Sequence, residues 1–279
     1  MQLVHTIAET RTAVTGARAQ GHSVGLVPTM GALHAGHLSL IRAARQREGW
    51  VGVSIFVNPT QFGPQEDLAS YPRTLEADAA RCEQAGVDLV FAPMAEEMYP
   101  EGFATTVHVA GLTERLCGQF RPGHFDGVTT VVGKLLGIFR PDRAYFGEKD
   151  YQQLVVVQRM AADLNLPVEI VGCPTVREAD GLALSSRNRC LTPQQRAVAP
   201  RLREALLAGA EVLRGGGSGE EAQARASEVL AGEPQFRVQY VEVVDPQTLE
   251  PSPGRGLPVV LAAAAYLGDT RLIDNLRVD

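Results

Sequence analysis

The sequence predicts an α/β fold: a Rossmann-like parallel sheet with helices on both faces, followed by a smaller C-terminal α+β domain. In the first half, short apolar runs alternate with helical patterns, and the connections between them are short. Roughly the last hundred residues differ, because two helical patterns precede three strand-like runs. A boundary near residues 175–180 gives a first, Rossmann-like domain of residues 1–176 and a C-terminal lid domain of residues 177–279.

The elements of the first half follow from their composition and their stop signals. Short β-branched runs ended by turn residues predict strands, and apolar residues at helical spacing predict helices. The expected strands are 23–29, 52–57, 88–92, 144–146 and 168–171. The expected helices are 38–48, one around residues 75–82, one around residues 128–139, and 151–165. Open sheets of this type bind ligands beyond the carboxyl ends of their strands, so the residues that follow each strand are the candidates for chemistry.

The second half begins with a strong helix start. Thr192 can cap, Pro193 suits the first turn and Gln195 can close a capping box, which predicts one long helix to about Arg214. Residues 215–219 read as a flexible loop, and residues 218 and 221 repeat the capping-box spacing before a second helix. Strands are expected at 236–244, 257–266 and 271–278.

Composition excludes several classes of protein. The 279 residues are 45% hydrophobic and 21% charged, which is ordinary for a globular enzyme. The formal net charge of -6 argues against broad nucleic-acid binding, although a local site for a small anion remains compatible with it. The four cysteines form no CxxC pair, and no apolar run is long enough to span a bilayer. Together with the lack of a signal-peptide pattern, this predicts a cytoplasmic protein with no membrane partner.

The strongest local signal is PTMGALHAGH at residues 28–37, which follows the first strand and opens a helix. Its glycines allow close approach of the backbone to a ligand, and a helix start suits phosphate. The imidazoles of His34 and His37, in an HxGH pattern, can donate hydrogen bonds to phosphate oxygens and stabilise charge in a transition state. Either histidine alone would be read as a surface residue beside a turn. The pair at a strand-to-helix junction favours a nucleotide site.

A second signal, FGEKDYQQ at residues 146–153, also joins a strand to a helix. Lys149 could reach a phosphate, and Gly147 allows close approach. The alternative is structural, because Asp150 and Gln153 have the spacing of a capping pair.

Three weaker signals complete the set. ADGLALSSRN at residues 179–188 places two hydroxyls before Arg187, whose planar fork matches phosphate, although a polar interdomain turn is the alternative. Asn58 and Gln61 follow the second strand and could contact hydroxyl and carboxylate groups, although Asn-Pro also marks ordinary turns. Asp78 is a weak Mg²⁺ candidate.

These motifs occur together in an order and at separations that resemble a known family. PTMGALHAGHLSLI, FVNPTQFGPQEDLASYPRTLEAD, RPGHFDGVTTVVGKL, FGEKDYQQL and ADGLALSSRN look like those of the pantoate–β-alanine ligases, within the HxGH nucleotidyltransferase superfamily. The C-terminal YLGDTRLIDN also fits, so the resemblance covers nearly the whole chain. HxGH alone is far less specific than the combination.

The resemblance implies a two-step ligase reaction, in which ATP activates pantoate as pantoyl adenylate and β-alanine then displaces AMP. It implies Mg²⁺, a homodimer, and catalytic roles for His37, His34 and Lys149. The implied ATP contacts are Met30, Gly31, Ala32, Leu33, His34, Ala35, Gly36, His37, Gly147, Glu148, Lys149, Asp150, Val176, Leu184, Ser185, Ser186 and Arg187. The implied contacts to the acid substrates are Gln61 and Gln153. Asn58 is a further candidate because it follows the second strand.

One position departs from the family pattern. Asp126 stands where some members carry a basic residue, which leaves the role of the RPGHFDG loop open. Two other functions are compatible with part of these motifs: a simpler nucleotidyltransferase that needs no Gln61 or Gln153, and a nucleotide-binding regulator without turnover. Release of AMP that requires an amine acceptor would distinguish the ligase from both.

Overall fold

The computed structural model describes residues 1–279 except 65, 67 and 255. Its residues group into two compact units, each made of several chain segments. The first unit comprises residues 1–114, 118–148 and 156–174, and the second comprises 115–117, 149–155 and 175–279. Each is described by itself.

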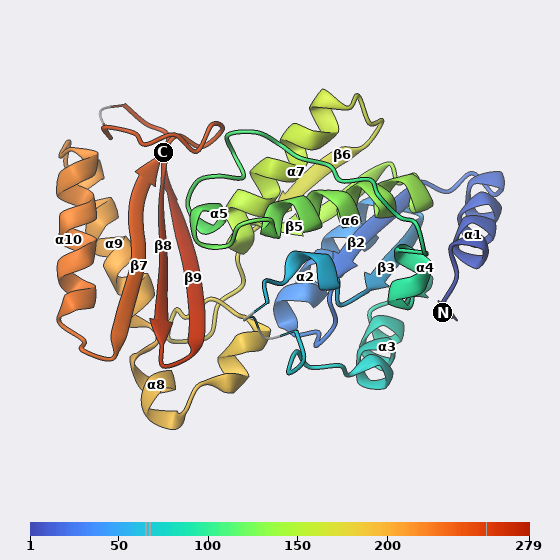
Figure 1. Cartoon of the computed structure of the whole chain (residues 1–279), viewed down its shortest axis with the longest axis horizontal. Helices are drawn as coiled ribbons and strands as arrows, with labels where there is room; N and C mark the ends of the chain where they lie inside the picture. The colour runs from blue at the N-terminus through green and yellow to red at the C-terminus, as the bar shows by residue number, and fades with distance from the viewer. Residues whose placement is uncertain (65, 67, 255) are drawn as a thin grey trace. The chain divides into compact units, whose positions relative to one another are not determined.

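The first unit is built on six parallel strands in the order β1-β4-β3-β2-β5-β6 (Figure 1). The strands are β1 Gln2–Val4, β2 Val24–Thr29, β3 Trp50–Ile55, β4 Leu89–Phe91, β5 Arg143–Gly147 and β6 Glu169–Cys173. The predicted parallel sheet is therefore confirmed. The chain adds strands outward from β2 on one side and later returns to place β5 on its other side, the type of strand reversal at which open sheets bind ligands.

Helices cover both faces of this sheet. They are α1 Ile7–Ala19, α2 Ala35–Arg47, α3 Leu75–Gln84, α4 Ala95–Met98, α6 His124–Phe139 and most of α7 Tyr151–Asp163. On one face, Ile41 of α2 packs with Val51 and Val53 of β3 in a buried cluster. On the other face, Phe139 of α6 lies so close to Gly52 that an added Cβ would meet its ring at 2.4 Å. Successive residues of a strand face opposite sides, so this alternation along β3 separates the two layers.

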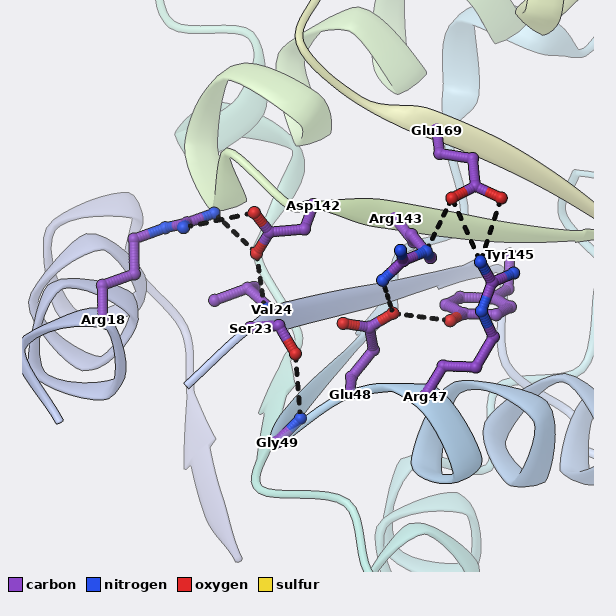
Figure 2. Close-up of polar contacts among 10 residues, drawn as sticks. All are labelled: Arg18, Ser23, Val24, Arg47, Glu48, Gly49, Asp142, Arg143, Tyr145 and Glu169. Carbon is purple, nitrogen blue, oxygen red and sulfur yellow. Dashed lines mark hydrogen bonds and ion pairs between the residues drawn. The ribbon is translucent and has the colours of Figure 1, made fainter. Parts of the chain in front are cut away.

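A polar network joins the carboxyl end of α2 to the amino ends of β5 and β6 (Figure 2). The side chain of Glu48 is fully buried, and its Oε1 accepts hydrogen bonds from Arg143 Nη1 at 3.0 Å and Tyr145 Oη at 2.8 Å. Glu169 accepts hydrogen bonds from Arg143 Nε at 2.6 Å and from Arg47 Nη2 at 3.1 Å. These hydrogen bonds, above all that from Arg143, and the two positive charges outweigh the effect of burial and lower the pKa of Glu169. Buried charges are normally paired in this way.

The second unit combines helices with the three-stranded antiparallel sheet β7-β8-β9 (Figure 1). Its strands are β7 Phe236–Val244, β8 Val259–Leu267 and β9 Thr270–Val278, and its helices are α8 Pro193–Val198, α9 Arg201–Arg214 and α10 Gly219–Ala231. Leu202 and Leu206 of α9 pack with Leu261 of β8 in one buried cluster. The predicted C-terminal α+β arrangement is confirmed.

One predicted element was wrong in extent. The long helix expected from Pro193 to about Arg214 is two helices, because Pro200 stands between them. Proline has no N–H to donate and its ring clashes with the preceding turn, so α8 ends before it and α9 starts after it. No helix among the described residues is long and apolar enough to cross a membrane.

Candidate active site

The loop between β2 and α2 carries the strongest predicted motif. Gly31 and Ala32 both have left-handed backbone conformations, with φ of 84° and 50°. An added Cβ at Gly31 would lie 3.1 Å from Asp78 Oδ2 and 3.2 Å from Ile55, so the loop needs glycine there for its conformation and its packing. The tight turn brings His34 to the first position before α2.

Both histidines cap α2. His34 Nδ1 accepts a hydrogen bond from Gly36 N at 3.2 Å, and His37 Nδ1 accepts one from His34 N at 3.3 Å. The ring centroids lie 4.2 Å apart. A neutral imidazole whose Nδ1 accepts a backbone N–H carries its proton on Nε2. Each ring therefore presents Nε2–H as a donor at the positive end of a helix, an arrangement suited to phosphate oxygens.

Asp78 holds this loop. Its side chain is buried, and its carboxylate accepts hydrogen bonds from Ala32 N and Leu33 N, both at 2.8 Å. Thr74 Oγ1 donates a further hydrogen bond at 2.9 Å. Both carboxylate oxygens thus bind protein donors. The contacts assign Asp78 to the support of the HxGH loop and give no support to its weak Mg²⁺ candidacy. No group of three or more metal-ligating side chains occurs among the described residues.

Asn58 and Gln61 form a connected pair after β3. Asn58 is buried, and its Nδ2 donates to Gln61 Oε1 at 3.0 Å. Its Oδ1 accepts hydrogen bonds from Tyr99 Oη at 2.8 Å and Thr60 Oγ1 at 2.9 Å. Gln61 Nε2 points to Met30 Sδ at 3.2 Å, which brings this predicted substrate residue to the HxGH loop. Asn58 therefore fixes which end of the Gln61 amide faces Met30.

The RPGHFDG loop supports the same pair from α6. Asn58 Nδ2 also donates to Gly127 O at 3.1 Å, and an added Cβ on Gly127 would meet Thr60 O at 2.5 Å. His124 Nδ1 lies 2.8 Å from Gln61 O. The sequence did not assign a role to this loop. In the structure, its contacts hold the backbone of the turn that carries Gln61.

Two residues of the RPGHFDG loop also form pairs with side chains elsewhere in the chain. Arg121 binds Glu66 through Nε at 2.7 Å and Nη2 at 2.5 Å. Burial alone would raise the pKa of Glu66, but the hydrogen bonds and charge of Arg121 outweigh it and lower that pKa. Asp126, the residue that departs from the family pattern, pairs with His108 Nδ1 at 2.8 Å. Sequence spacing could not indicate either pair, since the partners lie far apart in the chain.

The remaining predicted residues belong to the second unit, apart from Gly147 and Glu148 at the carboxyl end of β5. Lys149 Nζ lies 3.7 Å from Asp150 Oδ1. Ser185 Oγ accepts Arg187 N at 3.3 Å at the start of the short 3-10 helix Ser186–Cys190. Val176 O accepts a hydrogen bond from Leu184 N at 3.0 Å, so these two predicted ATP contacts close one hairpin. Gln153 is half-buried in the first turn of α7.

The sequence matches the family described as Pantoate-beta-alanine ligase over residues 2–277. The chain belongs to this ligase family. A pantothenate synthetase from Moorella thermoacetica is 57% identical over 277 residues, covering 99% of this chain and 98% of that protein. One from Pseudomonas aeruginosa is 52% identical over 280 residues, covering 100% and 99%.

Solved structures agree with this assignment. The pantothenate synthetase of Thermus thermophilus aligns with a TM-score of 0.95 at 54% identity, covering 99% of both chains. The ligase from Francisella tularensis, described as complexed with beta-gamma ATP and beta-alanine, aligns with a TM-score of 0.82 at 35% identity, covering 99% of this chain and 97% of that one. The family resemblance seen in the sequence is therefore confirmed.

Proposed function

We propose that the protein condenses pantoate with β-alanine at the expense of ATP, through a pantoyl adenylate, and releases AMP and pyrophosphate. The observation that carries the proposal is the pair of capping histidines, whose Nε2 donors stand at the start of α2 in a chain of the ligase family. The description of the Francisella tularensis relative, with its nucleotide and β-alanine, is consistent with the same substrates.

The chemistry needs no covalent enzyme intermediate. In the first step a pantoate carboxylate oxygen attacks the α-phosphorus of ATP, and the bond from that phosphorus to pyrophosphate breaks. In the second step the β-alanine amine attacks the acyl carbon, loses a proton, and the bond from that carbon to AMP breaks. Negative charge grows on phosphate oxygens in the first step, and donors fixed in advance stabilise it. His34 and His37 supply such hydrogen-bond donors in the proposal.

The other residues divide by task. Lys149 and the loop Ser185–Arg187 contribute positive charge and donors to the phosphates. The residues from Met30 to His37 and from Gly147 to Asp150, together with Val176 and Leu184, contact the nucleotide. Gln61 and Gln153 bind pantoate. Asn58, which the sequence placed with the substrate contacts, acts in this proposal by holding the Gln61 amide.

Mg²⁺ enters the proposal as part of the substrate, as MgATP. The Asp78 carboxylate is committed to Ala32 N and Leu33 N, so it does not fit a resident metal site. Mg²⁺ is commonly held through substrate phosphates. No step is assigned to a protein-bound ion.

The proposal includes a homodimer in the cytoplasm with no nucleic-acid or membrane partner. All four cysteines are free, as a reducing compartment requires. The net charge of -6 gives no basis for nucleic-acid binding. Sedimentation equilibrium would test the dimer, and a monomer at micromolar concentration would contradict it.

The test follows the oxygen atoms. The protein is incubated with MgATP and pantoate labelled with ¹⁸O in its carboxylate, with β-alanine present or omitted. Transfer of one ¹⁸O to AMP, with AMP release dependent on both acids, is the expected result. AMP without label would exclude the adenylate. Binding of ATP without release of AMP when both acids are present would favour the simpler nucleotidyltransferase.

A pair of histidine variants tests the residues. His37→Ala should lower kcat by about 100-fold or more, as loss of one transition-state donor does. His22→Ala is the matched control, because His22 is exposed and precedes β2 at the amino end of the sheet. Equal activity of the His37 variant and wild type would remove His37 from the mechanism.

A further inference from the structure

Strand β9 places two neighbouring polar side chains on opposite faces of the C-terminal sheet. Asp274 is 4% exposed and Asn275 is half-buried. Their register is fixed by β8, where Ala263 pairs with Asp274 and Ala262 with Asn275. Successive strand residues point to opposite sides, so the two side chains serve different neighbours from one rigid point. They lie in the LIDN segment, to which the proposed function gives no task.

Asp274 holds the hairpin that leads into the Ser185–Arg187 loop. Arg177 Nη1 donates to Asp274 Oδ2 at 2.7 Å and Nη2 to Oδ1 at 2.9 Å, a two-pronged ion pair. Arg177 Nη1 also donates to Gly181 O at 3.0 Å across the turn. Residues 177 and 183 form an isolated antiparallel bridge, and residue 185 lies two positions after it. The base of the loop is thereby attached to β9.

Asn275 binds the segment at Lys149, just before α7. Its Nδ2 donates to Lys149 O at 2.9 Å, the carbonyl of the residue proposed to reach the phosphates. Tyr151, the first residue of α7, donates a hydrogen bond from its Oη to Pro246 O at 3.0 Å. Gln152 is buried and adds a further tie, donating to Arg115 O at 2.7 Å. The start of α7 is therefore attached to the C-terminal unit, to which residues 149–155 belong.

We propose that Asp274 and Asn275 form one positioning element, which fixes the Lys149 backbone and the base of the Ser185–Arg187 loop relative to each other. The inference rests on the proposed function, because it assigns those two loops to the ATP phosphates. In this proposal the two β9 residues act through Lys149 and Arg177 and not by contact with substrate. The gain is preorganisation: long cationic side chains lose less freedom on binding when their backbones are already fixed. The hydrogen bond and the ion pair would be made before ATP arrives.

A double-mutant cycle tests the Asn275 arm. Asn275→Ala should lower kcat/KM for ATP by roughly 10-fold, the size that one hydrogen bond supports. In a Lys149→Ala background, the same change should have an effect of less than about 2-fold, because Asn275 acts through Lys149. Equal fold-changes in both backgrounds would overturn the coupling. If Asn275→Ala is insoluble, Asn275→Asp keeps the volume and removes the donor.

The role of Asp274 is tested against a control ion pair that involves the same hairpin. Asp274→Asn should raise the KM for ATP by about 10-fold or more, because Arg177 loses its buried counter-charge. Arg196→Ala removes the exposed ion pair of Arg196 with Asp180, at 2.6 Å, and should change KM by less than about 2-fold. Equal effects of the two variants would show that any loss of hairpin contacts suffices, against a specific role for Asp274.

Hydrogen exchange supplies a readout that needs no activity. Asn275→Ala should accelerate amide exchange over residues 149–155, and Asp274→Asn over 176–188, with α9 and α10 unchanged. Acceleration throughout the C-terminal unit would instead show general destabilisation and overturn the proposal. If wild type releases no AMP with pantoate and β-alanine, the proposed function fails while exchange still decides the structural part. If Lys149→Ala is fully active, the functional part of the inference fails.

Discussion

Removing the Tyr145 hydroxyl tests how far the buried Glu48 carboxylate depends on its hydrogen bonds (Figure 2). Both side chains are buried, and Tyr145 Oη donates a hydrogen bond to Glu48 Oε1 at 2.8 Å. Glu48 Oε1 receives one other donor, Arg143 Nη1, while Oε2 is buried without a hydrogen-bond partner among the described residues. Tyr145→Phe therefore leaves a buried charge with a single donor group.

The magnitude follows from the type of bond. Hydrogen bonds to charged groups contribute about 1.5–3 kcal/mol, so Tyr145→Phe should lower the free energy of unfolding by about 2 kcal/mol. In a Glu48→Gln background the acceptor is neutral, and charge-assisted bonds are roughly twice as strong as neutral ones. The same substitution should then cost about 1 kcal/mol.

Urea unfolding measures both values, from the midpoint at constant slope. Tyr266→Phe is the control, because the Tyr266 hydroxyl has no hydrogen-bond partner among the described residues while its ring packs against Arg237. That variant should change stability by less than about 0.5 kcal/mol. A cost below about 0.5 kcal/mol for Tyr145→Phe, or the same cost in both backgrounds, would refute the reasoning.

Gly127→Ala should abolish measurable activity and lower the melting temperature, because its Cβ would meet backbone Thr60 O at 2.5 Å and a backbone atom cannot rotate away; activity and thermal unfolding check this. Asp78→Asn should lower kcat/KM by about 10-fold or more, measured by steady-state kinetics, because the amide keeps one acceptor oxygen where the carboxylate has two that bind the HxGH loop. An unchanged kcat/KM would show that this support of the loop does not affect catalysis. Only the exposed Cys190 should react quickly with a thiol reagent at pH 8, and all four cysteines should react after denaturation. Burial, and then the charge of Asp78, raise the pKa of Cys82 to about 12, above its ordinary 9.0. The folded state therefore holds this proton more tightly, so the stability it contributes is complete below pH 9 and is lost as the pH rises toward 12; the penalty of Cys82→Ala should shrink over that window in unfolding titrations, and a constant penalty would contradict it.

The fold was largely predictable because its strands are apolar runs with clear stops. The run at 236–244 matches β7 in both bounds, and the run at 23–29 differs from β2 by one residue. The helix expected from residue 38 begins at Ala35 instead, because His34 caps it. Histidine is not among the usual capping residues, so composition gave no sign of the earlier start. The edge strand β1 and helix α1 were not predicted, since Gln2–Val4 is too short to show a period.

The site was predictable only where its residues are neighbours in sequence. The HxGH pair sits in one loop, and the structure brings Gln61 to that loop through Met30. The support of that loop by Asp78 joins positions 46 residues apart, and the tie from Asn275 to Lys149 joins positions 126 apart. Such contacts depend on packing of separate elements, which local periodicity does not encode.

The interleaving of the two units bears on how the chain is made. Residues 149–155 leave the ribosome well before β7, β8 and β9, yet they group with those strands in the finished protein. Leu154 and Val155 are buried there, so a nascent chain that ends before residue 175 lacks the elements with which they are grouped. The second unit therefore cannot be completed until its last strand, β9, has been synthesised. In particular, the hydrogen bond from Asn275 of β9 to the carbonyl of Lys149 can form only after β9 has left the ribosome.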